Sequence, residues 1–143
     1  MITLNYSAHI VAPREKVWQV LWADETYRTW SSAFMEGSYA ESYWEEGAEI
    51  KFLTPDKNGM FGIIEKMIPN TEMSFRHLGE IKDGIEVKKN WKDGTERYFL
   101  ANKDAGTQLD IVLTMDDGNK EFAGYLNAAF PEALKMIKQL SEV

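Results

Sequence analysis

The sequence predicts an α+β fold in which a curved, seven-stranded antiparallel sheet wraps around one long C-terminal helix. Three observations support this prediction. Residues 2–11 alternate between apolar and polar side chains, as a half-buried strand does. Six further segments with this period of two lie between residues 34 and 115 and are separated by turn residues. After 116–119, apolar side chains recur every three or four residues to the end of the chain, as in an amphipathic helix.

Two short helices are expected between the first and second strands. Pro13 suits the first position of a helix, because its φ angle is preset and its missing N–H costs no hydrogen bond there. An apolar stripe follows within 17–21, with Trp18 expected on its buried side. Asp24 is expected to cap a second helix at 25–30.

The remaining strands are expected to form antiparallel hairpins, because the separators between them are short and rich in Gly, Pro, Asn and Asp. Residues 81–94 are ambiguous, since Ile85 and Val87 could form a short extra strand beside solvated lysines. Pro131 should kink the final helix, which is the only segment long enough to cover the sheet. The six expected strands are 34–42, 47–53, 60–68, 72–80, 95–102 and 106–115.

Composition restricts the classes of function. We expect the 143 residues to form a single domain, and a hydrophobic content of 44% is enough for a core. The net charge of −7 disfavours nucleic acid and anionic membrane surfaces as partners. The absence of cysteine excludes disulfides and thiolate chemistry, and two separated histidines predict no metal site. Because neither a signal peptide nor a membrane-spanning run is evident, we predict a cytoplasmic location.

The alternation of apolar and polar residues in the strands, and their spacing in the helix, predict which side chains face the space between sheet and helix. These side chains either pack as an ordinary core or line a cavity. An empty apolar void of ~300 Å³ costs about 7 kcal/mol at about 24 cal/mol per Å³, which rivals a typical total stability of about 5–15 kcal/mol. A sizeable cavity would therefore imply a functional reason or an occupant.

Two inward positions could carry chemistry. His77 has the same strand parity as Phe75 and should point inward, where it could orient a ligand or exchange protons. The alternative is a core histidine that is hydrogen-bonded to Tyr98 or to the backbone. Tyr98 and Tyr39 can each serve as apolar wall and hydrogen-bonding group, or simply satisfy the backbone. The outer, solvated face of the sheet is expected to hold Glu65, Arg76 and Arg97.

Several segments, taken in this order, carry a family resemblance: 10–18 through Trp30, 62–69 leading to 73–75, 106–109, and the closing helix. Together they resemble the START-like, or SRPBCC, superfamily, and within it the bacterial branch named after the activator of the heat-shock protein 90 ATPase. The resemblance implies a helix-grip fold with a deep cavity between sheet and long helix, where relatives bind lipids, hormones, polyketides or other apolar molecules. It implies no catalytic residue and no cofactor, because the family has no universal catalytic set.

Our first functional hypothesis is the binding of a small hydrophobic or amphipathic ligand in that cavity. One alternative is a polyketide cyclase-like enzyme, in which His77 moves protons together with Tyr98 or Glu65. Another is a co-chaperone or stress-response protein with a chaperone partner, which would use an aromatic rim that includes Trp30 and Trp44. The expected ligand-binding residues are Trp30, Tyr39, Phe52, Phe75, His77, Tyr98, Leu100, Leu113, Phe122, Leu126 and Phe130.

Overall fold

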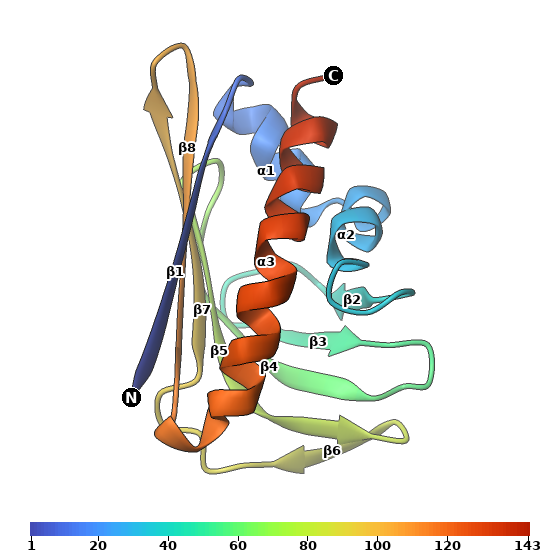
Figure 1. Cartoon of the computed structure of the whole chain (residues 1–143). Coiled ribbons are helices and arrows are strands. Elements are labelled where there is room, and N and C mark those ends of the chain that lie inside the picture. Colours follow the sequence, from blue (N-terminus) through green and yellow to red (C-terminus); the bar gives the residue numbers. More distant parts are fainter.

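The structure is a computed structural model that describes residues 1–143. One sheet curves around α3, and α1 and α2 pack beside the C-terminal half of that helix (Figure 1). This arrangement confirms the predicted α+β fold, including the two short helices between the first and second strands. The elements are β1 (Ile2–Ile10), α1 (Arg14–Trp22), α2 (Asp24–Ser31), β2 (Tyr39–Ser42), β3 (Glu49–Leu53), β4 (Gly59–Ile68), β5 (Glu72–Lys82), β6 (Ile85–Lys88), β7 (Thr95–Lys103), β8 (Gly106–Met115), a 3-10 turn (Asp117–Asn119) and α3 (Lys120–Ser141).

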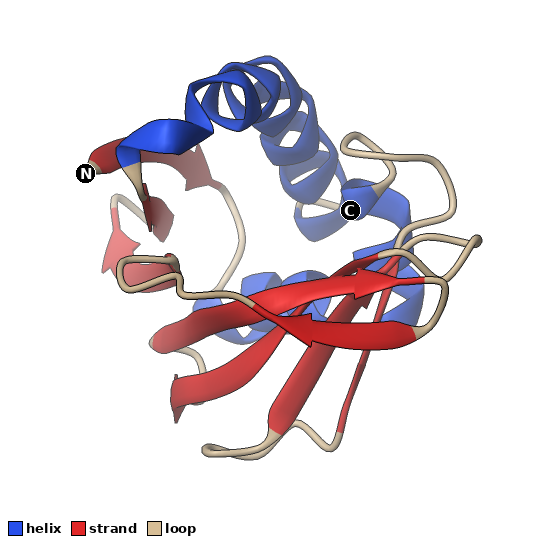
Figure 2. Cartoon of the chain, turned by 90° about the horizontal axis from the view of Figure 1, so that it is seen from below, coloured by secondary structure: helices blue, strands red, loops and turns tan.

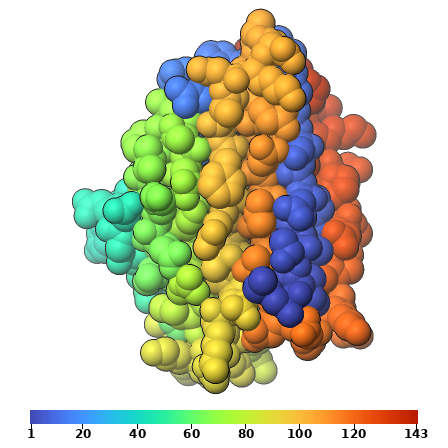
Figure 3. All heavy atoms as spheres, turned by 90° about the vertical axis from the view of Figure 1, so that its left-hand side faces the viewer, coloured from blue at the N-terminus to red at the C-terminus, as the bar shows by residue number.

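The sheet is antiparallel throughout, with the strand order β1-β8-β7-β5-β4-β3-β2 and with β6 paired to the end of β5. Seen along α3, the strands curl beneath the helix and form the concave side of the molecule (Figure 2). The opposite face is a continuous surface on which β7, β8 and β1 lie side by side (Figure 3). The two faces explain the alternation in the sequence, because every second side chain of a strand turns toward the helices.

The structure departs from the predicted boundaries in two places. The second strand begins at Tyr39, because residues 32–38 form turns that include Gly37 at a φ of 84°. The ambiguous segment contains the short strand β6, which brings the sheet to eight strands. It is joined to β5 by Asp83 and Gly84, whose φ angles of 51° and 80° match a two-residue hairpin turn.

Asp24 does not cap α2, contrary to expectation. The helix begins at Asp24 itself, and no side chain caps its first turn. The Asp24 carboxylate instead accepts hydrogen bonds from Nε of Arg28, one helical turn later, at 3.0 Å. This i,i+4 ion pair is an alternative way for an acidic residue to support the start of a helix.

The helix α3 is attached to the edge of the sheet and to the other helices. It continues through Pro131 and packs against β1, α1 and α2. Tyr6 on β1 stacks on Phe130 with ring centroids 4.5 Å apart and donates a hydrogen bond to Asn127. Lys138 donates to the carbonyl oxygen of His9. These contacts join α3 to β1, which is the edge strand of the sheet.

Trp22 lies at the centre of the core, whereas Trp18, which was expected on the buried side of the first helix, is less deeply buried. Trp22 is the last residue of α1 and is buried, whereas Trp18 packs against the core but is only half-buried. The Trp22 ring contacts five other aromatic rings, with centroid distances of 4.8–6.5 Å: Trp18, Trp30, Trp44, Phe75 and Tyr98.

No helix of the chain is long and apolar enough to cross a lipid bilayer.

A β-bulge in β5 changes which side chains face inward. The ladder between β4 and β5 pairs Gly62 with His77 but Phe61 with Gly79, so Leu78 is an extra residue. One extra residue reverses the alternation beyond it, and Glu80 therefore shares the inner face with His77. Gly62 permits the close approach of the strands, because a Cβ atom there would lie 2.1 Å from the backbone carbonyl oxygen of Arg76.

Candidate functional site

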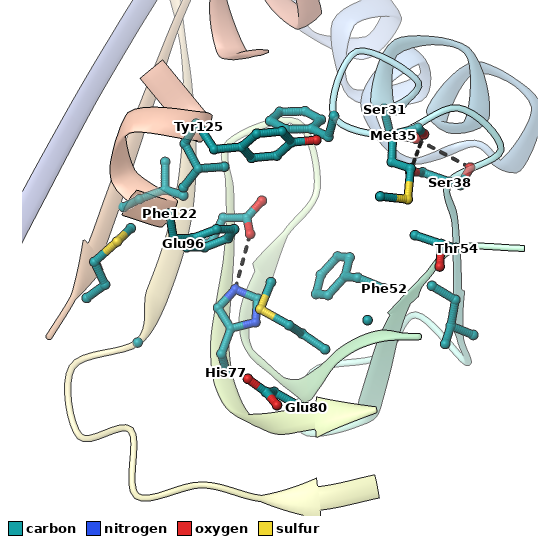
Figure 4. Close-up of a pocket in the computed structure, with 18 of the residues that line it drawn as sticks. Ser31, Met35, Ser38, Phe52, Thr54, His77, Glu80, Glu96, Phe122 and Tyr125 are labelled. Carbon is teal, nitrogen blue, oxygen red and sulfur yellow. Dashed lines mark hydrogen bonds and ion pairs between the residues drawn. The ribbon is translucent and has the colours of Figure 1, made fainter. Parts of the chain in front are cut away.

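A pocket of about 640 Å³ lies between the inner face of the sheet, α2 and the first half of α3. Its volume is within the usual range of roughly 300–1,000 Å³ for small-molecule sites. Of the 31 residues that line it, 17 are hydrophobic, so most of the wall is apolar. The close-up shows Phe52 projecting into the space opposite Phe122 and Tyr125 of α3 (Figure 4).

Exposed apolar side chains mark the opening of the pocket. Met35, Phe122 and Tyr125 line the pocket and are also 53%, 38% and 46% exposed to solvent. Met35 follows α2, whereas the two aromatic residues lie on the first turns of α3. The mouth is therefore bounded by Met35 on the α2 side and by two aromatic side chains on the α3 side.

Nine of the eleven residues expected to bind a ligand line this pocket. The two exceptions, Phe75 and Leu100, are buried in the core directly behind the wall. Phe75 packs against Phe52, with ring centroids 5.2 Å apart, and so supports a lining residue. The nine lining residues are Trp30, Tyr39, Phe52, His77, Tyr98, Leu113, Phe122, Leu126 and Phe130.

Trp30 and Trp44 do not form the exposed rim that was expected. Trp30 is only 2% exposed and belongs to the inner wall, where its indole N–H donates to the carbonyl oxygen of Leu21. Trp44 packs against Trp22 instead of lining the pocket. Tyr39 lines the pocket, and the guanidinium of Arg28 lies 4.9 Å from the centre of its ring.

A buried polar cluster lies at the base of the pocket. Nε2 of His77 on β5 is 3.2 Å from Oε1 of Glu96 on the neighbouring β7 (Figure 4). The hydroxyl of Tyr98 donates a hydrogen bond to the other carboxylate oxygen, Oε2. The alternation of β7 brings Glu96 and Tyr98 to the same face, and the β5–β7 pairing brings that face beside His77.

Glu96 is the functional candidate that the sequence analysis missed. It precedes Tyr98 by two residues and Leu100 by four, so the same alternation that places those two side chains inward applies to it. A carboxylate on the inward face of a strand is unusual and was the available signal. By contrast, Glu65 is not the proton partner of His77 that one alternative required. Its carboxylate pairs with Arg76 on the outer face of the sheet, where both residues were expected.

The ring of His77 has one free nitrogen. A carboxylate can only accept hydrogen bonds, so Nε2 carries the proton that faces Glu96. The other nitrogen, Nδ1, is buried and has no hydrogen-bond partner in the protein. A buried polar atom without a partner is uncommon, and this one is closed off from the pocket as well as from solvent.

The two tyrosines beside Glu96 are held in their protonated form. Burial, followed by the nearby Glu96 carboxylate, raises the pKa of Tyr98 well above its usual value. Burial above all raises the pKa of Tyr27, a second lining residue, in the same direction. Both hydroxyls therefore stay protonated well above neutral pH, and that of Tyr98 donates its proton to Glu96 in a hydrogen bond. No group of three or more His, Asp or Glu side chains lies close enough together to hold a metal ion.

Several solved structures resemble this chain at low sequence identity. The Aha1 dimer from Colwellia psychrerythraea has a TM-score of 0.77 and 20% identity, over 100% of this chain and 98% of that one. Protein CV1439 from Chromobacterium violaceum has a TM-score of 0.70 and 19% identity, over 100% and 99%. CalU16 from Micromonospora echinospora has a TM-score of 0.69 and 13% identity, over 97% and 65%. These likenesses establish the shared fold.

A search of curated protein sequences finds no match. The family model described as "Activator of Hsp90 ATPase homolog 1-like protein" matches residues 11–142. That match covers nearly the whole chain and agrees with the fold and with the segments 10–18 and 106–109 that carry the sequence resemblance. The chain therefore belongs to the family of Activator of Hsp90 ATPase homolog 1-like proteins within the START-like superfamily.

Proposed function

We propose that this protein binds a small, mostly apolar molecule with one polar end in the pocket beneath α3. The observation that carries the proposal is the combination of apolar walls with a buried polar cluster at the base. The walls would hold the apolar body of the ligand, with Phe52 and Leu113 on the sheet and Leu126 on α3. The Glu96 carboxylate at the base would contact its polar end.

The size of the pocket supports this proposal on energetic grounds. A dry apolar void of about 640 Å³ would cost on the order of 15 kcal/mol at about 24 cal/mol per Å³. That cost reaches the upper end of typical protein stabilities, about 5–15 kcal/mol. The pocket therefore holds solvent or a ligand in the working protein. Because its walls are largely apolar, displacing that solvent by an apolar molecule would be favourable.

Native mass spectrometry and thermal denaturation against a panel of lipophilic compounds would test the proposal. A compound present at about 100 times its dissociation constant should stabilise the fold by about 2.7 kcal/mol. Leu126→Trp, which extends a lining side chain into the pocket, should abolish that stabilisation. Ala128→Trp is the matched control, because Ala128 is exposed on the same helix and does not line the pocket.

Two results would count against the proposal. One is a panel in which no compound raises the unfolding temperature of the wild-type chain. The other is a compound whose effect survives in Leu126→Trp and disappears in Ala128→Trp, since it would then bind elsewhere. The name of the family refers to activation of the Hsp90 ATPase, and for this chain a chaperone partner stays a prediction without a contact surface to support it.

A further inference from the structure

Acidic side chains outnumber lysine and arginine among the residues that line the pocket. Its wall contains the carboxylates of Glu80, Glu96 and Asp116, one lysine, Lys82, and no arginine. Lys82 is exposed, and Glu80 lies 3.9 Å from Lys89, so both belong to the outer part of the pocket. Glu96, with a side chain 16% exposed, is the acidic group at the base.

No cation at the base offsets Glu96. Arg28 approaches Tyr39, but its guanidinium is bonded to Asp24 outside the pocket. The two neighbours of Glu96 that bond to it are the Tyr98 hydroxyl and the His77 ring. The carboxylate thus receives a hydrogen bond at each oxygen but has no lysine or arginine as a counter-ion.

His77 shields one side of Glu96 and offers a ligand no polar atom of its own. His77 is buried, with a side chain 9% exposed, and its ring lines the pocket. Its Nε2 is 3.2 Å from Oε1 of Glu96, and its Nδ1 is buried beyond the reach of a molecule in the pocket. Glu96, whose side chain is 16% exposed and lines the pocket, is therefore the group at the base to which a ligand can donate a hydrogen bond.

Both observations lead to one specificity, which rests on the proposed ligand-binding function. We infer that the polar end of the ligand is a neutral or positively charged hydrogen-bond donor, a hydroxyl or an amine, and that ligands ending in a carboxylate are rejected. A hydroxyl or amine can donate a hydrogen bond to the Glu96 carboxylate, and a protonated amine is attracted by its charge as well. A carboxylate has no proton to donate and would be repelled by Glu96 at short range in a weakly solvated site.

A matched set of three soluble naphthalene compounds separates charge from shape: 2-naphthylmethylamine, 2-naphthylmethanol and 2-naphthoate. Isothermal titration calorimetry at neutral pH should show the amine and the alcohol binding about tenfold or more tightly than the carboxylate. Glu96→Gln keeps the shape of the side chain and removes its charge, so it should weaken amine binding by about tenfold and narrow the gap to the carboxylate. Glu121→Gln makes the same charge change on an exposed residue outside the pocket and should leave the order unchanged.

Each result has a separate meaning. Binding of 2-naphthoate as tight as that of the amine would overturn the inferred specificity while leaving a ligand-binding pocket in place. An unaltered ratio in Glu96→Gln, with circular dichroism showing a folded variant, would also overturn it. If no naphthalene compound and no member of the lipophilic panel binds, the proposed function itself fails, and the specificity fails with it.

Discussion

Replacement of Trp22 by alanine tests whether the aromatic cluster holds the helices against the sheet. Trp22 is 8% exposed and ends α1, and its ring lies 4.8 Å from the ring of Tyr98 and 5.4 Å from that of Phe75. It therefore joins α1 to two strands of the sheet and also supports a residue of the pocket wall. Its removal should destabilise the whole fold, because no other aromatic ring of α1 contacts Tyr98 or Phe75.

The magnitude follows from the buried volume that is lost. Truncation of a buried tryptophan or phenylalanine to alanine usually costs about 3–5 kcal/mol, and each aromatic contact adds about 0.5–1.5 kcal/mol. We therefore expect Trp22→Ala to lose about 4 kcal/mol, a large part of a typical stability of about 5–15 kcal/mol. Trp22→Phe should lose much less, because it keeps a ring and removes an indole N–H that is buried without a partner.

Urea denaturation followed by far-ultraviolet circular dichroism measures these differences. Trp18→Ala is the control, since Trp18 lies on the same helix, is half-buried and contacts the cluster only through Trp22. The reasoning would be refuted if Trp22→Ala cost no more than Trp18→Ala. It would also be refuted if Trp22→Phe were as damaging as Trp22→Ala, because the ring contacts would then be irrelevant.

Two further predictions concern ionisation and turn geometry. The pKa of Tyr98 is higher in the folded state than in the unfolded chain, so the protonated phenol favours the folded state. This contribution to stability is complete below about pH 10 and is lost as the pH rises further. Tyr98→Phe should therefore show a smaller fall in the urea midpoint between about pH 9 and pH 11 than the wild type, with the exposed Tyr43→Phe as control. Ala105 has a φ of 60° in the turn between β7 and β8, so Ala105→Gly should raise the free energy of unfolding by about 0.5–1 kcal/mol. Ala101→Gly, within β7, should lower it, and equal changes in the two variants would contradict the turn argument.

Much of the fold could be predicted because alternation and helical spacing are local properties of the chain. The alternation of 2–11 and 106–115 becomes β1 and β8, and the spacing after 116–119 becomes α3. Short turns favour antiparallel neighbours, and the structure pairs them in that way. The segment around β6 was ambiguous because its alternation is limited to Ile85 and Val87, and the structure leaves all four of its side chains exposed.

The candidate site was predictable only in part, because parity states which face a side chain occupies but not what lies opposite. Parity placed His77 and Tyr98 inward, and the structure brings both to the pocket. It did not reveal that Glu96 would bond to both, since that depends on the pairing of β5 with β7. Nor could parity reveal that Glu80 lies on the inner face, because the extra residue in the β5 bulge reverses the alternation beyond it.

The sequence by itself determined the elements, their order and the inward faces of the strands, because these depend on spacings of two to four residues. Only the tertiary structure decided whether those inward faces meet or leave a space. That outcome depends on the contacts of α3 with β1, α1 and α2, which hold the helix at the edge of the sheet and leave the pocket beneath its first half. The distance between two packed layers is set by residues far apart in the chain, and no local pattern encodes it.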